Sequence, residues 1–538
     1  MKSEIGDETK TSNVSELETL EAIQDRVLWL STRMIDYANA DRPNLDGLKV
    51  GGHQASSASM VSILTALYFD FLDSEDRISI KPHASPVFHS IQYLLGNLDE
   101  SYLKKLREAG GLQSYPSRTK DPDTVDFSTG SVGLGAVAPL FAAVTRQYVD
   151  SHFGPRPKSR FISVIGDAEL DEGNIWEALA DPITANLGNV MWIVDFNRQS
   201  LDRVIPGVRI AQWRAQFEAA GWHVKEVKYG SKLVKVFEDS NSQDFKIWFD
   251  EIPNEQYQSL FGLTPKEARI RFLEGSPEGV SQFLDKYSDE ELFEILTDLG
   301  GHDISSLLET FKECDAVENK PSVVFAYTIK GWHLPIAGDK RNHSAQISKK
   351  QIDELRTLLG ISESNEWSKF EPGSAEDSLC LSRAHSLKRP SSKAEISADF
   401  PHTAGIAPTG SSSSQEAFGR VLTEISRNEA IRPYLVTTAP DVATSTNLGG
   451  FINRHGIFNK DVKREWNNNS IQKWVEGPKG QHIELGISEM NLFTLLGQLG
   501  ISGDISDQPL IPIGTVYDPF VLRGLDAFIY SVYSGAKF

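Results

Sequence analysis

The 538-residue sequence predicts an α/β protein built from doubly wound domains with parallel sheets. The first observation is that short β-like apolar runs alternate with helical stretches up to about Leu359, and again after Gln415. The second is a composition change between them, because residues 371–414 are rich in Ser, Pro, Ala and charge and end in GSSSS. We therefore expect a first α/β domain over residues 15–370, a linker over 371–414 and a second α/β domain over 415–538.

The first domain is expected to follow a disordered N-terminus, residues 1–14, and to open with a helix over Ser15–Ala40. Its strands are expected at Phe161–Ile165, Val190–Phe196 and Pro321–Ile329. A helix is expected over Asn174–Leu187, between the first two. This order predicts one βαβ unit with a right-handed crossover.

The second domain is expected to have strands at Pro433–Ala439, His482–Ile487 and Pro509–Val516. The chain then ends in an amphipathic helix, LRGLDAFIYSVYSGAKF, with no strand after it. We expect this domain to be either unusually small or part of a longer chain.

Composition excludes some classes of function. A net charge of -20 argues against nucleic acid or an anionic membrane as the main partner, because a phosphate-binding surface needs basic residues. The two cysteines, Cys314 and Cys380, form no CxxC pattern, and no apolar run approaches the length of a membrane span. A cytoplasmic protein is expected.

The stretch SVIGDAELDEGNIWEAL places four carboxylates directly after a predicted strand. Asp167 follows that strand, and Asn197 follows the next strand 30 positions later. Parallel strands leave their carboxyl ends at one edge of a sheet, so the two side chains can converge there. Their oxygens are ligands that Mg²⁺ prefers, and free N–H groups at the following helix start would suit phosphates. The alternative is that Asp167 only caps a helix and Asn197 only makes a turn.

The pattern GD-x-x-x-x-EG followed by DFN resembles the thiamine diphosphate motif of the transketolase and pyruvate dehydrogenase superfamily. The resemblance implies a thiamine diphosphate-binding fold, in which a diphosphate-binding domain precedes a pyrimidine-binding domain that is incomplete here. It implies that Asp167, Asn197 and the backbone carbonyl of Gln199 hold Mg²⁺. Gly166, Glu169 and Ala168 (where the family usually has Gly) would lie against the diphosphate.

Further segments extend the resemblance along the chain, in order: GGHQASS, KPHASPVFHSIQYLLG, GLQSYPS, FSTGSVGLGAV, GGHD and TIKGWHLP. These are most similar to the homodimeric, bacterial-type pyruvate dehydrogenases. The resemblance implies that His53 and His83 face the substrate, and that the cofactor is positioned by Ser56, Gly130, Val132 and Lys330. Taken singly, each histidine is better explained by a structural role, but the ordered set of matches favours the functional interpretation.

In the second domain, Glu489 opens an apolar helix after a strand. A glutamate in the first helical turn is favourable against the helix dipole, which is the structural explanation. The family pattern GI-x-E instead implies that Glu489 hydrogen-bonds the aminopyrimidine ring, within an apolar environment that helps a carboxyl keep its proton. Asp441 would neighbour the cofactor across a subunit interface, and Tyr517 and Phe520 are candidates for stacking on the pyrimidine.

The family assembles its active sites between two copies of the chain, so the resemblance implies a homodimer. Glu172 matches an acidic residue that links the two sites, whereas Asp171 is read as a favourable charge near the helix start. The chain departs from the dehydrogenase pattern at Lys81, where glutamine is usual, and at Ser117. The histidine expected near Ala345 is absent, and His343 is a candidate either for its replacement or for a counterpart of the transketolase histidine.

The implied reaction is thiamine diphosphate- and Mg-dependent oxidative decarboxylation of a 2-oxo acid, with pyruvate expected, and acyl transfer to a lipoyl group on an acyltransferase partner. One alternative is a transketolase, which moves two-carbon ketol units between sugar phosphates. A second is a truncated module that binds the cofactor without turnover.

Overall fold

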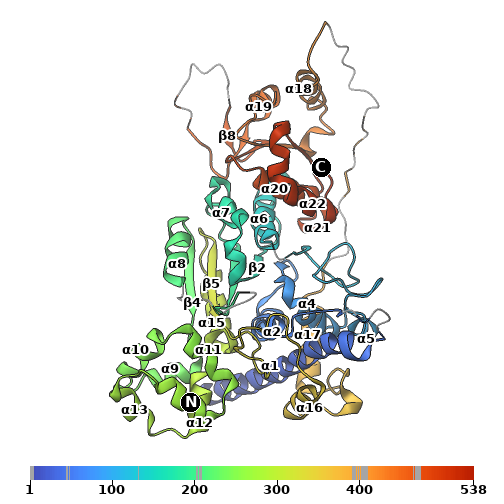
Figure 1. The fold of residues 1–538 in the computed structure, drawn as a ribbon. Helices are drawn as coiled ribbons and strands as arrows, with labels where there is room; N and C mark the ends of the chain where they lie inside the picture. Colours follow the sequence, from blue (N-terminus) through green and yellow to red (C-terminus); the bar gives the residue numbers. More distant parts are fainter. Residues whose placement is uncertain are drawn as a thin grey trace.

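The computed structural model shows two parallel sheets stacked along one axis (Figure 1). It describes residues 5–538 except 44–46, 48, 131, 201–203, 205–208, 390–394, 397, 399, 401–409, 465 and 467–473, with the side chains described from residue 16 onwards. Among these residues, every helix is too short or too polar to cross a lipid bilayer.

The first sheet has the strand order β1-β2-β3-β5-β4, and all its strands are parallel. The strands are β1 (Arg77–Ser79), β2 (Phe161–Gly166), β3 (Val190–Phe196), β4 (His223–Val227) and β5 (Ser322–Tyr327). Strands β2 and β3 are neighbours, with Gly166 opposite Asp195, so the predicted βαβ unit is confirmed. Both strands are buried along their whole length, as expected for a sheet covered on two faces.

The second sheet has the strand order β10-β6-β9-β7-β8, again all parallel. Its strands are β6 (Leu435–Pro440), β7 (Ile457–Phe458), β8 (Glu476–Gly477), β9 (His482–Leu485) and β10 (Ile511–Gly514). The three strands expected here are present, with ends shifted by one or two residues.

Helices cover both faces of the first sheet. They are α1 (Ile5–Asp36), α2 (Gln54–Ala58), α3 (Val61–Ala66), α4 (Ser85–Leu94), α5 (Glu100–Leu103), α6 (Leu134–Phe153), α7 (Gly173–Ala180), α8 (Ile210–Ala219), α15 (Ile304–Asp315), α16 (Lys349–Leu358) and α17 (Ala375–Ser386). Two five-residue π-helices, η1 (Tyr37–Asp41) and η2 (Leu67–Phe71), extend α1 and α3.

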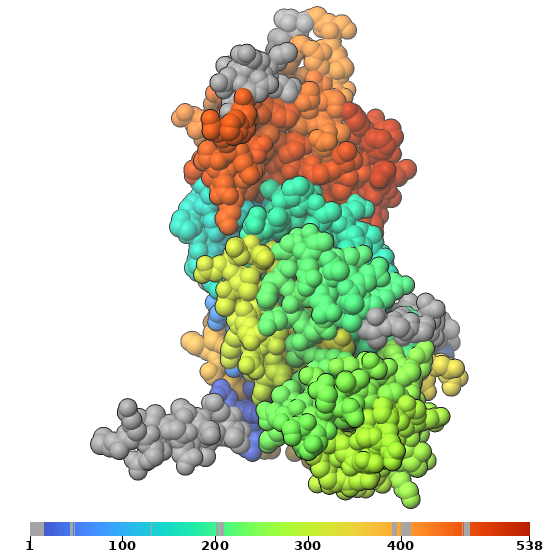
Figure 2. Space-filling model, turned by 90° about the vertical axis from the view of Figure 1, so that its left-hand side faces the viewer, coloured from blue at the N-terminus to red at the C-terminus, as the bar shows by residue number. Residues whose placement is uncertain are grey.

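A group of short helices forms the end of the molecule opposite the second sheet, as Figures 1 and 2 show. It comprises α9 (Ser231–Phe237), α10 (Gln243–Glu251), α11 (Asn254–Gln258), α12 (Pro265–Leu273), α13 (Glu278–Leu284) and α14 (Asp289–Leu296). The second sheet is accompanied by α18 (Ser414–Ile425), α19 (Gly449–His455), α20 (Glu489–Gly500), α21 (Ser502–Ile505) and α22 (Leu525–Tyr533).

Short 3-10 turns connect many of these elements. They are η3 (Pro82–Ala84), η4 (Asp167–Asp171), η5 (Pro182–Thr184), η6 (Ser259–Gly262), η7 (Gly300–His302), η8 (Glu363–Asn365), η9 (Arg432–Tyr434) and η10 (Asp518–Gly524).

One hydrophobic core runs from the first sheet into the second. Alternate residues of β3, including Trp192 and Val194, face the side covered by α6, while Ile193 faces the side covered by α1, α3 and α4. Helix α6 also packs against α20, whose leucines join the same core as Val436 and Ile483 of the second sheet. Figure 2 accordingly shows the orange and red residues seated directly on the cyan and green ones.

The structure corrects several expected boundaries. Helix α1 begins at Ile5, whereas residues 1–14 were expected to be disordered; residues 1–4 lie outside the described residues. The helix expected over Asn174–Leu187 ends at Ala180, because Pro182 cannot continue it, and the chain then forms η5.

The segment expected to be a linker contains α17, which packs against α1 and η2. Cys380 is buried there, and the Arg383 guanidinium donates to the carbonyls of Tyr68 and Leu72, with Nε 2.9 Å from the Tyr68 oxygen. Residues 375–386 are therefore part of the first unit.

Candidate active site

A cavity of 430 Å³ opens where β1, β2, β3 and β5 end. Most of the residues expected to form the site line it: His53, Ser56, His83, Gly166, Asp167, Ala168, Glu169, Glu172, Asn197, Gln199, Lys330 and His343. Lys81, Tyr115 and Ser200 complete its wall. The carboxyl edge of a parallel sheet is where α/β proteins bind ligands, and the cavity follows that rule.

Asp167 and Asn197 lie at the same edge because β2 and β3 are in register. Both are buried. The Asp167 Oδ2 accepts a hydrogen bond from the backbone N–H of Arg198 at 2.7 Å, and the Asn197 Oδ1 accepts one from the N–H of Gln199 at 3.0 Å. The Asp167 carboxylate and the Asn197 amide oxygen thus bind the N–H groups of two successive residues, Arg198 and Gln199, which brings the two side chains together.

Burial and the nearby negative charge of Asp195 together raise the pKa of Asp167 to about 7, although the Arg198 N–H and Lys81 oppose the shift. Burial likewise raises the pKa of Glu169 to about 7, against its hydrogen bond from the Gly166 N–H at 3.0 Å. Two carboxyls that resist ionisation at one edge of a cavity are typical of a place where a cation supplies the missing positive charge.

The residues fit Mg²⁺ and a diphosphate. A buried carboxylate and an amide oxygen form the hard oxygen donor set that Mg²⁺ takes together with phosphate oxygens. Lys330 lines the same wall, with its Nζ 3.1 Å from the carbonyl of Ser200, and adds positive charge beside it. The segment after Asp167 is the 3-10 turn η4 rather than the expected α-helix start, which comes only at Gly173.

Asp195 is an important residue of this site that the sequence did not indicate. It is fully buried on β3, two residues before Asn197, which directly follows the strand. Its Oδ2 accepts from Lys81 Nζ at 2.5 Å, from Ser59 Oγ at 2.7 Å and from Asn197 Nδ2 at 3.3 Å. Thr328 Oγ1 donates to its Oδ1. The buried cation Lys81 and these donors lower the pKa of Asp195 despite its burial.

Three histidines form the other end of the cavity. The ring centroids of His53 and His83 lie 4.3 Å apart, and His343 stacks on His53, also at 4.3 Å. The His53 Nδ1 lies 2.8 Å from the carbonyl oxygen of His343, and Tyr115 lies beside His83 with ring centroids 5.7 Å apart. His343 therefore lies in the same cavity as His53 and His83.

All three imidazoles are held neutral. Burial lowers the pKa of His83 to about 2 and that of His343 to about 3, and Lys81 and Lys330 contribute in the same direction. Burial also lowers the pKa of His53. Their nitrogens lie within 4.8 Å of one another, close enough to share a metal ion. The same burial and lysines that keep protons away also disfavour a metal cation, so this end suits a neutral or anionic group.

Glu172 lines the cavity and precedes the first residue of α7. It packs against Gly133, where a Cβ atom would come 3.0 Å from the Glu172 Cβ and 2.6 Å from the Asn174 Oδ1. That Oδ1 is buried without a hydrogen-bond partner in the described structure. Asp171, in contrast, is exposed and lies 3.6 Å from the Arg209 guanidinium, as a solvated charge would.

The structure does not place two expected cofactor residues in the cavity. Gly130 and Val132 lie outside its lining, and Val132 is 39% exposed. The Val132 carbonyl instead accepts a hydrogen bond from Asn174 Nδ2 at 3.2 Å, which ties this loop to α7.

The second-sheet residues also lie outside this cavity, at the carboxyl ends of their own strands. Asp441 follows β6 and is exposed, with its N–H donating to Glu484 Oε1 at 3.0 Å. Tyr517 and Phe520 follow β10, exposed by 38% and 41%. Within one chain, the structure therefore keeps the pyrimidine-side candidates apart from the diphosphate-side ones.

Glu489 is buried at the start of α20, where Ser488 caps the helix. Its surroundings were expected to be apolar. Its Oε2 instead lies 3.2 Å from the Nε of Arg523, so a cation is part of them. The helix start is anchored to α7 by Ser488 Oγ, which donates to Glu177 Oε2 at 2.5 Å. Asn491 Nδ2 adds a bond to the Glu177 carbonyl at 3.0 Å.

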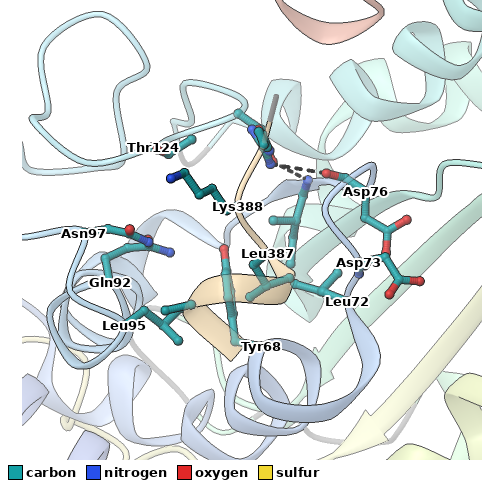
Figure 3. A pocket seen from close by; sticks show the side chains of 14 residues that line it. Tyr68, Leu72, Asp73, Asp76, Gln92, Leu95, Asn97, Thr124, Leu387 and Lys388 are labelled. Atoms are coloured by element: carbon teal, nitrogen blue, oxygen red, sulfur yellow. Dashed lines mark hydrogen bonds and ion pairs between the residues drawn. The ribbon is translucent and has the colours of Figure 1, made fainter. Parts of the chain in front are cut away.

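A second cavity, of 440 Å³, lies on the outer side of β1 between η2, α4 and the segment after α17 (Figure 3). Tyr68, Gln92 and Lys388 face into it. Arg389 closes one side by pairing with both oxygens of Asp126, with Nη2 2.8 Å from Oδ2. Asp73 and Asp76 pair with Arg160, which lies outside the lining. None of the residues expected in the active site lines this cavity.

Comparisons with known proteins agree with this geometry. Residues 49–242 match the family model described as "Transketolase, thiamine diphosphate binding domain". The pyruvate dehydrogenase E1 component of Pseudomonas aeruginosa is 26% identical over 530 residues, covering 93% of this chain and 59% of its own length. That of Escherichia coli is 25% identical, covering 89% and 57%. The chain thus spans a little under three fifths of these relatives.

Solved transketolase structures share the fold. The enzyme from Leishmania mexicana aligns with a TM-score of 0.65 at 17% identity, over 96% of this chain and 67% of its own. A Pichia stipitis transketolase aligns with a TM-score of 0.64 at 16% identity, over the same shares. Residues 49–242 therefore form a transketolase-type thiamine diphosphate-binding domain, and the chain has the fold of the solved transketolases.

Proposed function

We propose that this chain catalyses thiamine diphosphate- and Mg-dependent oxidative decarboxylation of a 2-oxo acid, with pyruvate as the expected substrate and a lipoyl group as the acyl acceptor. The observation that carries the proposal is a single cavity with oxygen ligands at one end and neutral imidazoles at the other. The relatives named as pyruvate dehydrogenase E1 components support the choice of reaction.

The chain's own residues divide the work in this proposal. Asp167, Asn197 and the Gln199 carbonyl hold Mg²⁺, while Gly166, Ala168, Glu169, Ser56 and Lys330 surround the diphosphate. Thiamine diphosphate, when bound there, would supply the nucleophilic carbon and the electron sink that decarboxylation of a 2-oxo acid requires. His53, His83 and His343 face the substrate with unprotonated rings and can accept or donate a proton at its oxygens.

A homodimer is part of the proposal, because Glu489 does not line the cavity of its own chain. Apolar side chains are exposed around it: Ile487 by 77%, Leu522 by 74%, Ile529 by 56% and Val532 by 54%. Several exposed apolar side chains on neighbouring elements favour a protein interface at this place. A second copy placed there would bring Glu489 and Asp441 to the cavity across the interface, and Glu172 would then link the two sites.

The test is an assay of the purified chain with thiamine diphosphate and Mg²⁺. Pyruvate with ferricyanide as electron acceptor should show decarboxylation, and the Asp167→Ala variant should lose it by at least about a hundredfold. Matched reactions without pyruvate, and with the Asp171→Ala variant, serve as controls. Turnover of xylulose phosphate and ribose phosphate alone would contradict the proposal.

Transketolase activity is the second candidate. The observation that favours it is the set of three neutral imidazoles with Tyr115, since such groups hydrogen-bond hydroxyl-rich substrates well. A third outcome, cofactor binding without turnover, would appear as heat of thiamine diphosphate binding in calorimetry with neither reaction observed.

A further inference from the structure

Asp441, the second-unit residue expected beside the cofactor, has an unusual backbone conformation. It directly follows β6 and has a φ of 59°, in the left-handed region that residues other than glycine rarely adopt. Its side chain is exposed, and its N–H donates a hydrogen bond to the Glu484 Oε1 at 3.0 Å. A strained residue persists only where its surroundings hold it, and Glu484 provides such a contact.

Glu484 lies on the neighbouring strand, at the position that this contact requires. Strands β6 and β9 are parallel, with Ala439 opposite Glu484 and Pro440 opposite Leu485. The Glu484 side chain therefore has to reach only two residues along β6 to meet the Asp441 N–H. The side chain is 26% exposed, so it lies mostly within the protein at the edge of the sheet.

Two buried side chains fix Glu484 in turn. His482 lies two residues before it on the same face of β9, and the His482 Nε2 is 2.7 Å from the Glu484 Oε2. The His482 Nδ1 is 2.9 Å from the Oγ1 of Thr437, its register partner on β6. Both His482 and Thr437 are completely buried.

This arrangement does not depend on a charge state. The contact between the His482 ring and the Glu484 carboxyl forms whichever of the two carries the shared proton. In either case the Glu484 Oε1 is an acceptor for the Asp441 N–H.

We propose that Glu484 is a positioning residue that fixes the Asp441 backbone, with His482 and Thr437 holding Glu484 in place. A series of hydrogen bonds then runs from the buried centre of the second sheet to the exposed end of β6. The inference rests on the proposed function in one respect, which is that Asp441 contacts the cofactor across the subunit interface.

Three substitutions of Glu484 separate this role from a general effect on folding. Glu484→Gln keeps an oxygen for the Asp441 N–H and gains an NH₂ group that can donate to His482 in its other tautomer. Glu484→Asp keeps a carboxyl group for His482, but its side chain is one methylene too short to serve both partners. Glu484→Leu nearly keeps the size of the side chain and removes both hydrogen bonds.

The experiment measures thiamine diphosphate affinity by calorimetry in excess Mg²⁺, together with the melting temperature of each chain. Glu484→Asp and Glu484→Leu should weaken cofactor binding by about three- to thirtyfold, and Glu484→Gln by less than about twofold. Asp441→Ala should weaken binding to a similar extent. Adding Glu484→Asp to Asp441→Ala should cause no further loss, because Glu484 acts only through Asp441.

A second measurement does not involve the cofactor. In chain labelled with ¹⁵N-aspartate, the Asp441 amide signal is assigned with the Asp441→Asn variant. This signal should move upfield in Glu484→Asp and Glu484→Leu, because the N–H loses its acceptor, and should keep its position in Glu484→Gln.

Glu476→Leu is the matched control. Glu476 is a half-buried glutamate on β8 of the same sheet, and its Oε2 accepts from Asn459 Nδ2 at 3.3 Å. Its substitution should leave the Asp441 amide signal and the cofactor affinity unchanged.

Wild-type cofactor affinity in both Glu484→Asp and Glu484→Leu would overturn the inference. Losses that add to that of Asp441→Ala, or an unmoved Asp441 signal in Glu484→Asp, would also overturn it. If the wild-type chain binds thiamine diphosphate without catalysing either reaction, only the proposed function fails. If pyruvate is decarboxylated and the Glu484 variants behave as the wild type, only this inference fails; if the wild-type chain binds no thiamine diphosphate, both fail.

Discussion

At the scale of single residues, the site contains a buried carboxyl group whose ionisation is unfavourable and which a bound cation would stabilise in its ionised form. Asp167 and Asp195 are both buried beside one another, yet only Asp195 has a lysine partner. The result is a raised pKa for Asp167 and a lowered one for Asp195. The metal-free chain therefore contains a carboxyl that is not favourably ionised at neutral pH, in the place where a cation is expected.

This difference predicts a pH-dependent effect of the Asp167→Asn substitution. The pKa of Asp167 is about 7 in the folded chain, above its ordinary value. The protonated Asp167 side chain therefore stabilises the folded state fully below about pH 4, and this contribution to the free energy of unfolding is lost as pH rises through 7. Relative to the wild type, the metal-free Asn variant should gain about 4 kcal/mol in free energy of unfolding between pH 4 and pH 7.5.

Urea titrations over this pH range measure the difference between the two chains. The exposed Asp171→Asn substitution in the same segment is the control and should show no such trend. A constant difference between Asp167→Asn and the wild type at all pH values would contradict the prediction.

The histidines give a second prediction at this scale. Because burial lowers the pKa of His83 to about 2 and of His343 to about 3, their rings should stay neutral throughout the range in which free histidine titrates. Nuclear magnetic resonance of ¹³C-histidine-labelled chain, assigned with His83→Gln and His343→Gln, should show no titration of these two signals between pH 5.5 and 8. Titration of either signal near pH 6.5 would refute the neutral-ring assignment.

At the scale of elements, α17 and the segment after it act as a strap across the first unit. Arg383 donates hydrogen bonds to the carbonyls of Tyr68 in η2 and of Leu72 just after it. Arg389 pairs with the buried Asp126 and lowers the pKa of that carboxyl. Asp126 in turn accepts a hydrogen bond from the N–H of Ile78 at 2.9 Å, at the start of β1. The strap therefore reaches the edge strand of the first sheet.

Arg389→Ala should destabilise the chain by about 3 kcal/mol, because it leaves the Asp126 carboxylate buried without a counter-ion. Lys388→Ala, an exposed neighbour that lines the same cavity (Figure 3), should change the free energy of unfolding by less than about 0.5 kcal/mol. Urea denaturation measures both. Equal effects of the two substitutions would show that the ion pair with Asp126 contributes nothing specific.

Helices α20 and α22 make the closest helix contact in the second unit, and a glycine permits it. A Cβ atom on Gly497 would come 2.3 Å from the Ser531 Oγ and 2.9 Å from its Cβ. Gly497→Ala should therefore lower the free energy of unfolding by about 2 kcal/mol, as overpacking does. Gly173→Ala, at the open start of α7 with no atom near the added methyl, should be neutral or slightly stabilising. Thermal melts of both variants test the comparison.

The elements that sequence could predict are those whose pattern is local. The buried strands β2, β3 and β5 read as uninterrupted apolar runs and lie within two residues of the predicted ends. Strand β4, HVKEV, was missed because it is a partly exposed edge strand with polar residues. The three-residue β1 and the two-residue β7 and β8 carry too little pattern to be recognised.

The same distinction applies to the site. Asp167, Asn197 and the histidines follow strands or turns with recognisable motifs, and the structure gathers them in one cavity. The importance of Asp195 could not be predicted, because it depends on Lys81 arriving from a different part of the chain. Gly130 and Val132 were expected in the cavity wall, but the contact of their loop with Asn174 depends on how α7 packs.

At the scale of the whole molecule, the two sheets share one core through α6 and α20. Tyr148 of α6 shows the connection, since it is fully buried, stacks on His152 and packs against Phe458 of β7 with ring centroids 5.2 Å apart. Two units that share buried aromatic and leucine side chains are expected to unfold together.

Leu496→Ala tests this cooperativity. Leu496 of α20 is buried against Gly514 at the end of β10, so its truncation should cost about 3 kcal/mol. The loss should appear as one shifted transition, whether monitored by fluorescence of single-tryptophan chains retaining Trp192 in the first sheet or Trp474 near the second. Separate midpoints for the two probes would mean that the units unfold independently.

Helix α6 has a consequence for how such proteins can be recombined. One of its faces covers β2 and another packs against α20, so the side chains of α6 must fit neighbours in both units. A chimera that joins the first 410 residues of this chain to the corresponding later segment of a relative would place a foreign α20 on an unchanged α6. Exchanging α6 together with α20 would preserve their mutual fit, so productive crossover points are set by this helix pair and not by the connecting segment.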